Sequence, residues 1–216
     1  MIKAVLFDFD GVVVDSEPVH YETFREFVEP LGIRVDTDRW YREFAGTGSK
    51  NIFTVLLGEA GIKDGKTIDD YVEKRKKVYG KLVRKGLVKK KGGIENFLKK
   101  LKKMKIRTAV VSGGHPENIE AALKVIGLKK YFDIVIGSGN YKRRKPYPDA
   151  FITGAKKLGV KPDECIVIED SLSGFKAAKK AKMKTVLMHS PAVKYIKTKE
   201  KVIRNYREFP MKLLRD

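Results

Sequence analysis

The stretch Ala4-Val5-Leu6-Phe7-Asp8-Phe9-Asp10-Gly11 decides the fold that we expect for this chain. A run of Val, Leu and Phe is typical of a buried parallel strand, and the carboxyl ends of such strands open into the crevice where α/β sheets bind ligands. Asp8 and Asp10 are two residues apart, so they are expected to share one face, and Gly11 lets the chain turn with its backbone N–H accessible to an anion. The stretch therefore predicts a site for a divalent cation and a phosphate.

Two other interpretations apply to residues 8–11. Asp before Gly at a strand end is also common turn chemistry, and this alternative stays open when the stretch is considered alone. A calcium loop that begins at Asp8 would need a bidentate Glu where Val19 stands, and Gly11 comes two positions too early for such a loop. The remainder of the chain has to decide between a turn and a site.

Apolar, β-branched runs recur along the chain and alternate with amphipathic segments. The predicted strands cover residues 4–9, 108–112, 133–136, 165–169 and 185–188. The predicted helices between the later strands cover residues 95–104, 117–126, 149–158 and 172–182. Right-handed crossovers then give an α/β fold, a doubly wound, parallel, five-stranded and Rossmann-like sheet covered on both faces.

A helical insertion interrupts this rhythm after the first strand. Residues 15–84 contain helical pattern at 18–28, 39–44, 51–57 and 68–83 and no convincing strand. We therefore expect a catalytic α/β core at 1–14 and 85–216 and an all-helical cap domain at 15–84. Both connections leave from the edge of the sheet that carries the acids, so the cap is expected to cover the site as a lid.

The composition indicates a packed globular protein. Hydrophobic residues make up 42% of the 216 residues, with no low-complexity tract or repeat. No apolar stretch approaches the length of a membrane span, and the chain starts directly with a strand instead of a signal peptide. We therefore expect a cytoplasmic protein without a membrane partner. We also expect a monomer. The single cysteine, Cys165, lies in an apolar run and is expected to be a buried, inert thiol.

The formal net charge is +20, from 47 Lys and Arg against 27 Asp and Glu. Such a field could attract nucleic acid, and a basic nucleic-acid-binding module is one alternative. The lysines, however, recur between apolar residues at helical spacing, which is typical of solvated helix faces, and we expect no specific nucleic-acid partner. The chain has no glutamine and is dominated by Lys and Glu, a bias seen in proteins of thermophiles.

The later strands also end in chemically useful residues. Ser112-Gly113-Gly114 precedes a helix, so a hydroxyl, free N–H groups and a helix N-terminus form a candidate phosphate cradle. Two prolines stiffen the loop around Lys145, whose ammonium can act as a point charge. Glu169-Asp170 ends another apolar strand, where uncompensated buried carboxylates are costly but suit a hard cation.

In order and position, these residues resemble the four motifs of the haloacid-dehalogenase superfamily. The matching residues are Asp8-x-Asp10-Gly11, Ser112, Lys145 within Lys-Pro-x-Pro-Asp, and Glu169-Asp170. The resemblance covers essentially the whole chain, and Asp15-Ser16-Glu17-Pro18-x-His20 is similar to the β-phosphoglucomutase-like subgroup. True dehalogenases of the superfamily lack the second acid, so Asp10 favours phosphoryl chemistry.

The resemblance implies a role for each motif residue. Asp8 would attack phosphorus and form an aspartyl phosphate, while Asp10 protonates the leaving oxygen and then deprotonates water. Ser112, Lys145 and the backbone of Gly113 would neutralise the transferring oxygens. The cofactor would be Mg²⁺, and the ligands that the resemblance implies are the Asp8 carboxylate, the Asp10 carbonyl, Asp170, and Glu169 directly or through water.

The insertion should select the substrate. The resemblance places substrate-binding residues at Gly11, His20, Gly46, Thr47, Lys50, Gly113 and Gly114. The arginine with which β-phosphoglucomutase holds the distal phosphate is missing, and Lys50 cannot reproduce its bidentate fork. We therefore favour a phosphatase of a small phosphorylated metabolite, such as a sugar phosphate, over a phosphosugar mutase.

Overall fold

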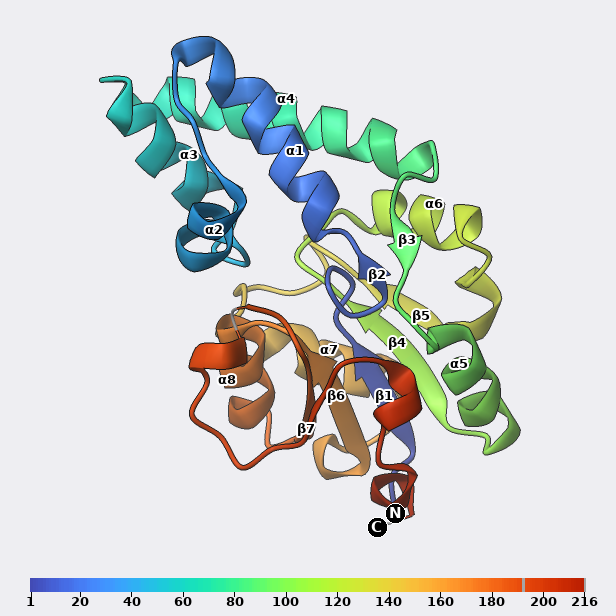
Figure 1. Ribbon diagram of the computed structural model, residues 1–216. Helices are drawn as coiled ribbons and strands as arrows, with labels where there is room; N and C mark the ends of the chain where they lie inside the picture. Colours follow the sequence, from blue (N-terminus) through green and yellow to red (C-terminus); the bar gives the residue numbers. More distant parts are fainter. Residues whose placement is uncertain (192, 216) are drawn as a thin grey trace. The chain divides into compact units, whose positions relative to one another are not determined.

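The computed structural model describes residues 1–191 and 193–215, which form two compact units. Unit 1 combines Met1–Asp15 with Lys89–Asp216, and unit 2 is Ser16–Val88. Figure 1 shows the strands of the large sheet in unit 1 and the helices of unit 2. Each unit has its own core and is described by itself.

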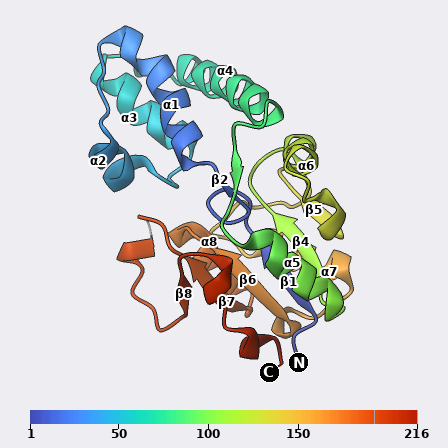
Figure 2. The same cartoon turned by 45° about the vertical axis from the view of Figure 1, so that its right-hand side comes forward.

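Unit 1 is built on a parallel sheet with the strand order β5-β4-β1-β6-β7-β8 (Figures 1 and 2). Its strands are β1 (Ala4–Phe7), β4 (Arg107–Val111), β5 (Ile134–Ile136), β6 (Cys165–Glu169), β7 (Lys184–Met188) and β8 (Val202–Ile203). β1 pairs with β4 on one side and β6 on the other, so Phe7 lies beside Val110 and Ile168. This register brings the carboxyl ends of the three central strands to one edge.

The doubly wound fold that the sequence predicts is confirmed, but the prediction of five strands was wrong. Within the described residues the sheet has six strands, because Val202–Ile203 pairs with Leu187 and Met188. A two-residue strand among charged residues carries no period that a sequence pattern could reveal. A separate antiparallel pair, β2 (Val14–Asp15) and β3 (Lys89–Lys90), lies outside the large sheet.

Helices connect the successive parallel strands from β1 to β7. They are α5 (Ile94–Lys103), α6 (Pro116–Val125), α7 (Asp149–Leu158) and α8 (Leu172–Lys180). α5 contacts β4 and α6 contacts β5, whereas α7 packs on β1, β4 and β5, and α8 packs on β6 and β7. The chain moves outward through α5 and α6 and back through α7 and α8, so right-handed crossovers place these two pairs on opposite faces.

The core of unit 1 explains why its strands read as continuous apolar runs. The four residues of β1 and the five of β6 are all buried, as expected for parallel strands covered on both faces. The α7 side contains a cluster with Leu6, Val111 and Phe151. The other face holds an aromatic group in which the rings of Phe7 and Phe97 meet edge to face at 6.1 Å.

Unit 2 is helical. It comprises α1 (Glu17–Val28), α2 (Thr37–Arg39), the π-helical turn η2 (Trp40–Phe44), α3 (Ser49–Glu59) and α4 (Gly65–Arg84). α4 packs against both α1 and α3 around a core that includes Trp40, Phe44 and Phe53. Asp64 starts α4 by accepting hydrogen bonds from the backbone of Lys66 and Thr67, a standard N-cap.

Short 3₁₀ turns complete the chain: η1 (Glu29–Leu31), η3 (Lys129–Tyr131), η4 (Pro162–Glu164), η5 (Val193–Tyr195), η6 (Tyr206–Glu208) and η7 (Met211–Leu214). Within the described residues, none of the helices combines the length and the apolar character that crossing a membrane requires.

Candidate active site

Lys145 joins the ends of two central strands. It lies in the loop between β5 and α7, and its Nζ donates to Asp8 Oδ1 at 2.6 Å and to Glu169 Oε1 at 2.5 Å. A third bond runs from Nζ to the carbonyl oxygen of Val111 at 3.2 Å, at the end of β4. The structure therefore brings three residues of the sequence motifs, Asp8, Lys145 and Glu169, into direct contact although Lys145 is 137 positions from Asp8.

Both oxygens of the Glu169 carboxylate accept hydrogen bonds. While Oε1 binds Lys145, Oε2 accepts from the backbone N–H groups of Asp170 and Ser171 at 2.9 and 3.0 Å and from the Ser171 hydroxyl at 2.9 Å. Gly174 makes this possible, because a Cβ at that position would lie 1.7 Å from Oε1. These bonds engage both oxygens, so the arrangement favours a role for Glu169 in orienting Lys145 over direct metal ligation.

Asp170 lies against the loop that follows β1. Gly11 has φ +71°, and a Cβ there would lie 1.9 Å from Asp170 Oδ2, so only glycine allows this approach. Ser190 fixes the other side of Asp170, because its hydroxyl donates to the Asp170 carbonyl at 2.6 Å. The carboxylate of Asp170 thus faces the turn that carries Asp10 and Gly11.

The end of β4 provides the candidate phosphate cradle. Ser112 is buried, its Oγ accepts from the Gly114 N–H at 3.1 Å, and its carbonyl accepts from the Tyr141 hydroxyl at 3.1 Å. Gly113 and Gly114 are exposed just before α6. Gly137 packs tightly on this loop, since a Cβ there would lie 2.6 Å from the Gly114 carbonyl oxygen. The backbone of the cradle is therefore supported from β5.

The sequence did not single out Tyr141 or Ser190, or the hydrogen bonds of Ser171. Tyr141 and Ser190 act through contacts with residues distant in the chain; the Tyr141 hydroxyl, for example, donates to the Ser112 carbonyl across 29 positions. Ser171 acts partly through its backbone N–H. Only Ser171 carried a local signal. It follows Glu169-Asp170 directly and caps α8 by accepting from the Gly174 N–H.

The expected substrate residues of the insertion lie in unit 2. The Nδ1 atom of His20 is hydrogen-bonded to the buried guanidinium of Arg75, and its ring stacks on Tyr79 at 4.4 Å. Gly46 and Thr47 are exposed after η2, and Lys50 forms an exposed ion pair with Asp69 at 2.8 Å.

Burial and charge act together on the central pair. Burial raises the pKa of Asp8 to about 7, with Lys145 lowering it and the charges of Glu169 and Asp10 raising it. Burial by itself would lower the pKa of Lys145, but Asp8 and Glu169 outweigh this effect, so its pKa lies above the ordinary value and the ammonium stays charged. The site therefore holds an excess of acidic groups over cations.

The donor set fits Mg²⁺. Across the part of the chain that the structure describes, no three His, Cys, Asp or Glu side chains are arranged so that they could hold a metal ion. Mg²⁺ does not need three, because it retains several waters and binds through one or two carboxylates together with substrate phosphate. Asp8 and Asp170, beside the Asp10 turn, offer such oxygens, and a cation there would offset the cost that burial and the neighbouring acids place on ionised Asp8.

We expect the stability of the metal-free protein to reveal this cost of ionising Asp8. The folded-state pKa of Asp8, about 7, exceeds its ordinary value of 3.8, so the cost of ionising Asp8 is absent near pH 4, grows between these values and is complete above pH 7. Above pH 7, Asp8→Asn should therefore raise the thermal midpoint in EDTA, and Mg²⁺ should raise the wild-type midpoint more than the variant's.

Thermal denaturation at pH 4.5, 6 and 8, with EDTA or Mg²⁺, measures both effects. Asp38→Asn is the matched control, because it makes the same change of residue at a side chain that is 87% exposed. A wild-type midpoint that responds to Mg²⁺ no more than that of Asp8→Asn would contradict Asp8 as a ligand.

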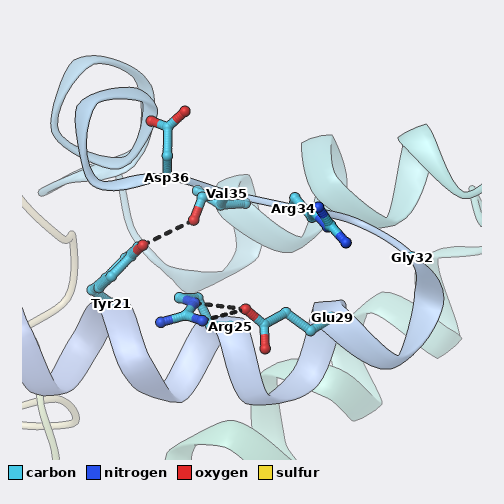
Figure 3. Close-up of a pocket in the computed structure, with 7 residues that line it drawn as sticks. All are labelled: Tyr21, Arg25, Glu29, Gly32, Arg34, Val35 and Asp36. Atoms are coloured by element: carbon cyan, nitrogen blue, oxygen red, sulfur yellow. Dashed lines mark hydrogen bonds and ion pairs between the residues drawn. The ribbon is translucent and has the colours of Figure 1, made fainter.

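Unit 2 also contains a surface cavity of about 710 Å³, seen in Figure 3. It is lined by Tyr21, Arg25, Glu29, Gly32, Arg34, Val35 and Asp36. The Tyr21 hydroxyl donates to the Val35 carbonyl at 2.9 Å, and Arg25 is paired with Glu29 at 2.6 Å (Figure 3). Because its two arginines are balanced by two acids, we assign this cavity no part in phosphate chemistry.

Comparison with curated proteins and solved structures finds phosphatases and a mutase. The chain is 30% identical over 195 residues to the phosphorylated carbohydrates phosphatase of Thermotoga maritima, covering 88% of this chain and 87% of the relative. It is 31% identical over 185 residues to the fructose-1-phosphate phosphatase of Escherichia coli, covering 84% and 94%. Its fold is similar to that of β-phosphoglucomutase from Clostridium difficile, with a TM-score of 0.81, 26% identity and coverage of 100% and 96%.

The match to a family model agrees with the geometry. The model described as haloacid dehalogenase-like hydrolase matches residues 5–188, which include the carboxyl ends of β1, β4, β5 and β6. The resemblance drawn from the motifs is confirmed, and so is the assignment of the chain as an enzyme. With Asp8, Lys145 and Glu169 in contact at the carboxyl edge of the sheet, the chain belongs to the haloacid dehalogenase-like hydrolase family.

Proposed function

We propose that this enzyme is a Mg²⁺-dependent phosphatase that hydrolyses a small phosphate monoester, of the sugar-phosphate class, through an aspartyl phosphate. The observation that carries the proposal is the contact of the Lys145 ammonium with Asp8 beside the Ser112 cradle. A carboxylate held by a fixed cation is suited to attack phosphorus, because the cation also neutralises the oxygens of the transferring group. The names of the Thermotoga and Escherichia relatives support the substrate class.

The proposed reaction has two displacements. A carboxylate oxygen of Asp8 forms a bond to phosphorus as the bond to the substrate oxygen breaks, and Asp10 gives its proton to that leaving oxygen. Asp10, now ionised, takes a proton from water, whose oxygen then attacks phosphorus and releases Asp8 and inorganic phosphate. Asp10 thus starts and ends the cycle protonated.

The other residues bind and orient. Lys145, the Ser112 hydroxyl and the Gly113 backbone N–H would hold the oxygens of the phosphoryl group. Asp8, the Asp10 carbonyl and Asp170 would hold Mg²⁺, which when bound supplies positive charge for the phosphate and keeps Asp8 ionised. In unit 2, His20, Gly46, Thr47 and Lys50 are the residues that we propose for substrate selection.

A phosphosugar mutase is the second candidate, favoured by the likeness to β-phosphoglucomutase. A mutase has to hold a bisphosphate at both ends while it turns around and has to keep water from the phosphoenzyme. The loop before α3 has no arginine for a distal phosphate, and Lys50 is paired with Asp69. These features favour transfer to water.

We expect inorganic phosphate to be the main product when the enzyme meets a sugar phosphate. The test is incubation with β-glucose 1-phosphate, a trace of the 1,6-bisphosphate and Mg²⁺, with glucose 6-phosphate and free phosphate followed together. Asp8→Asn, purified in the same way, controls for contaminating enzymes, because it should form neither product. If glucose 6-phosphate forms much faster than free phosphate, the enzyme is a mutase and the phosphatase proposal is wrong.

A further inference from the structure

Tyr206 reaches the turn after β1 from the far end of the chain. Its hydroxyl donates to the carbonyl oxygen of Val12 at 3.0 Å across 194 positions. Both residues are buried, with 4% of Tyr206 and none of Val12 exposed. A hydrogen bond between two buried groups is costly to lose, because the remaining carbonyl would be left without water.

The turn that accepts this hydrogen bond carries Asp10, the proposed general acid and general base. The N–H groups of Val13 and Val14 both donate to the Phe9 carbonyl, at 2.9 and 3.1 Å, so residues 9–14 fold back as one unit. Lys91 donates its N–H to the Val13 carbonyl at 3.0 Å. Asp10 lies inside this unit, so its position depends on the supports that hold Val12 and Val13.

Tyr206 is itself a rigid support. It begins η6, its backbone N–H donates to the Gly92 carbonyl at 3.0 Å, and its ring stacks on Phe97 at 5.1 Å. The ring also lies 6.1 Å from that of Phe7 in β1. Burial, with smaller effects of Asp8 and Asp170, raises the pKa of the phenol well above its ordinary value, so the hydroxyl keeps the proton that it donates.

We propose that Tyr206 is a positioning residue for Asp10, which it holds in place through the hydrogen bond to the Val12 carbonyl. The inference rests on the proposed function only for the role of Asp10 in proton transfer. It extends that function to the segment after β7, which contributes none of the motif residues.

Tyr206→Phe isolates the hydroxyl, because the ring and its packing remain. We expect kcat to fall about tenfold or more, since displacement of a catalytic group by about 1 Å can cost up to a hundredfold. KM should change less than kcat, because Lys145, Ser112 and Gly113, which we propose hold the phosphoryl group, lie outside the turn that this bond supports. The two steps that need Asp10 are the ones that should slow.

Tyr21→Phe is the matched control. It also removes one tyrosine hydroxyl that donates to a backbone carbonyl, that of Val35 at 2.9 Å, but in unit 2. With p-nitrophenyl phosphate and Mg²⁺ as the assay, kcat of Tyr21→Phe should match the wild type even where its thermal midpoint falls. A kcat of Tyr206→Phe equal to that of the wild type would overturn the proposal.

Hydrogen exchange of the peptide that contains residues 9–14 separates this inference from the proposed function. Exchange at Val13 and Val14 should be faster in Tyr206→Phe and unchanged in Tyr21→Phe, measured equally far below each midpoint. If the wild type hydrolyses no phosphate ester, the proposed function fails and exchange alone decides about Tyr206. Unchanged exchange in Tyr206→Phe would then overturn the role of the hydroxyl.

Discussion

Asp8→Asn is expected to lower phosphate release by a factor of about 10⁴ or more, as loss of an essential nucleophile does in other enzymes. The amide cannot form the bond to phosphorus, and it offers a weaker oxygen to a cation. The fold should persist, because Lys145 keeps its bond to Glu169 and the buried charge of Asp8 is removed. Release of inorganic phosphate from a panel of sugar phosphates, at saturating Mg²⁺, measures the effect.

Asp10→Asn provides the informative comparison. Attack by Asp8 does not require Asp10 as a base, so this variant should accumulate phosphoenzyme that water hydrolyses slowly. A radiolabelled phosphoryl group that is retained by Asp10→Asn and absent from Asp8→Asn would identify the nucleophile. Turnover by Asp8→Asn at the wild-type rate would show that the reaction does not pass through an aspartyl phosphate at Asp8.

The sequence predicts the sheet well because its signals are local. Continuous apolar runs such as Cys165–Glu169 and capped amphipathic helices such as Asp149–Leu158 match the observed bounds. Since parallel strands end at one edge, placing the strands was enough to bring the acids, Ser112 and Lys145 to the same edge. The sequence did not predict short strands such as Val202–Ile203, because pairing with β7, and not a local pattern, makes them strands.

The sequence did not predict which groups engage each other at that edge. Glu169 reads as a metal ligand when only residue types are considered, but the structure turns it to Lys145 and the backbone after it. The same limit applies to Tyr206, whose bond to Val12 spans almost the whole chain. Contacts of this length depend on the packing of several elements, which no local pattern contains.

Lys145→Met is expected to have the second largest effect and to act on stability as well as activity. Lys145, Asp8 and Glu169 are 12%, 15% and 1% exposed, so removing the cation leaves two carboxylates together in a poorly solvated place. Breaking a buried ion pair from one side typically costs about 3 to 5 kcal/mol of unfolding free energy. Activity should fall by about 10² to 10³, because the transferring oxygens lose a fixed positive charge.

The destabilisation should depend on pH in a defined direction. Without the ammonium, the pKa of Asp8 rises beyond about 7, so ionisation of its carboxyl opposes folding over a wider range. The loss of stability relative to the wild type should therefore be larger at pH 8 than at pH 5, where Asp8 is protonated in the variant. Urea denaturation at the two pH values, in EDTA, measures the difference.

Two further variants test whether the destabilisation comes from the unpaired buried carboxylates. Arg143→Met removes a cation from the same loop, but one that is 58% exposed and paired with Asp149, so it should change stability by at most about 1 kcal/mol. Adding Glu169→Gln to Lys145→Met should recover much of the lost stability, because one of the two opposed carboxylates is gone, yet it should not restore activity. Equal destabilisation by Lys145→Met with and without Glu169→Gln would show that the two side chains do not form an energetic pair.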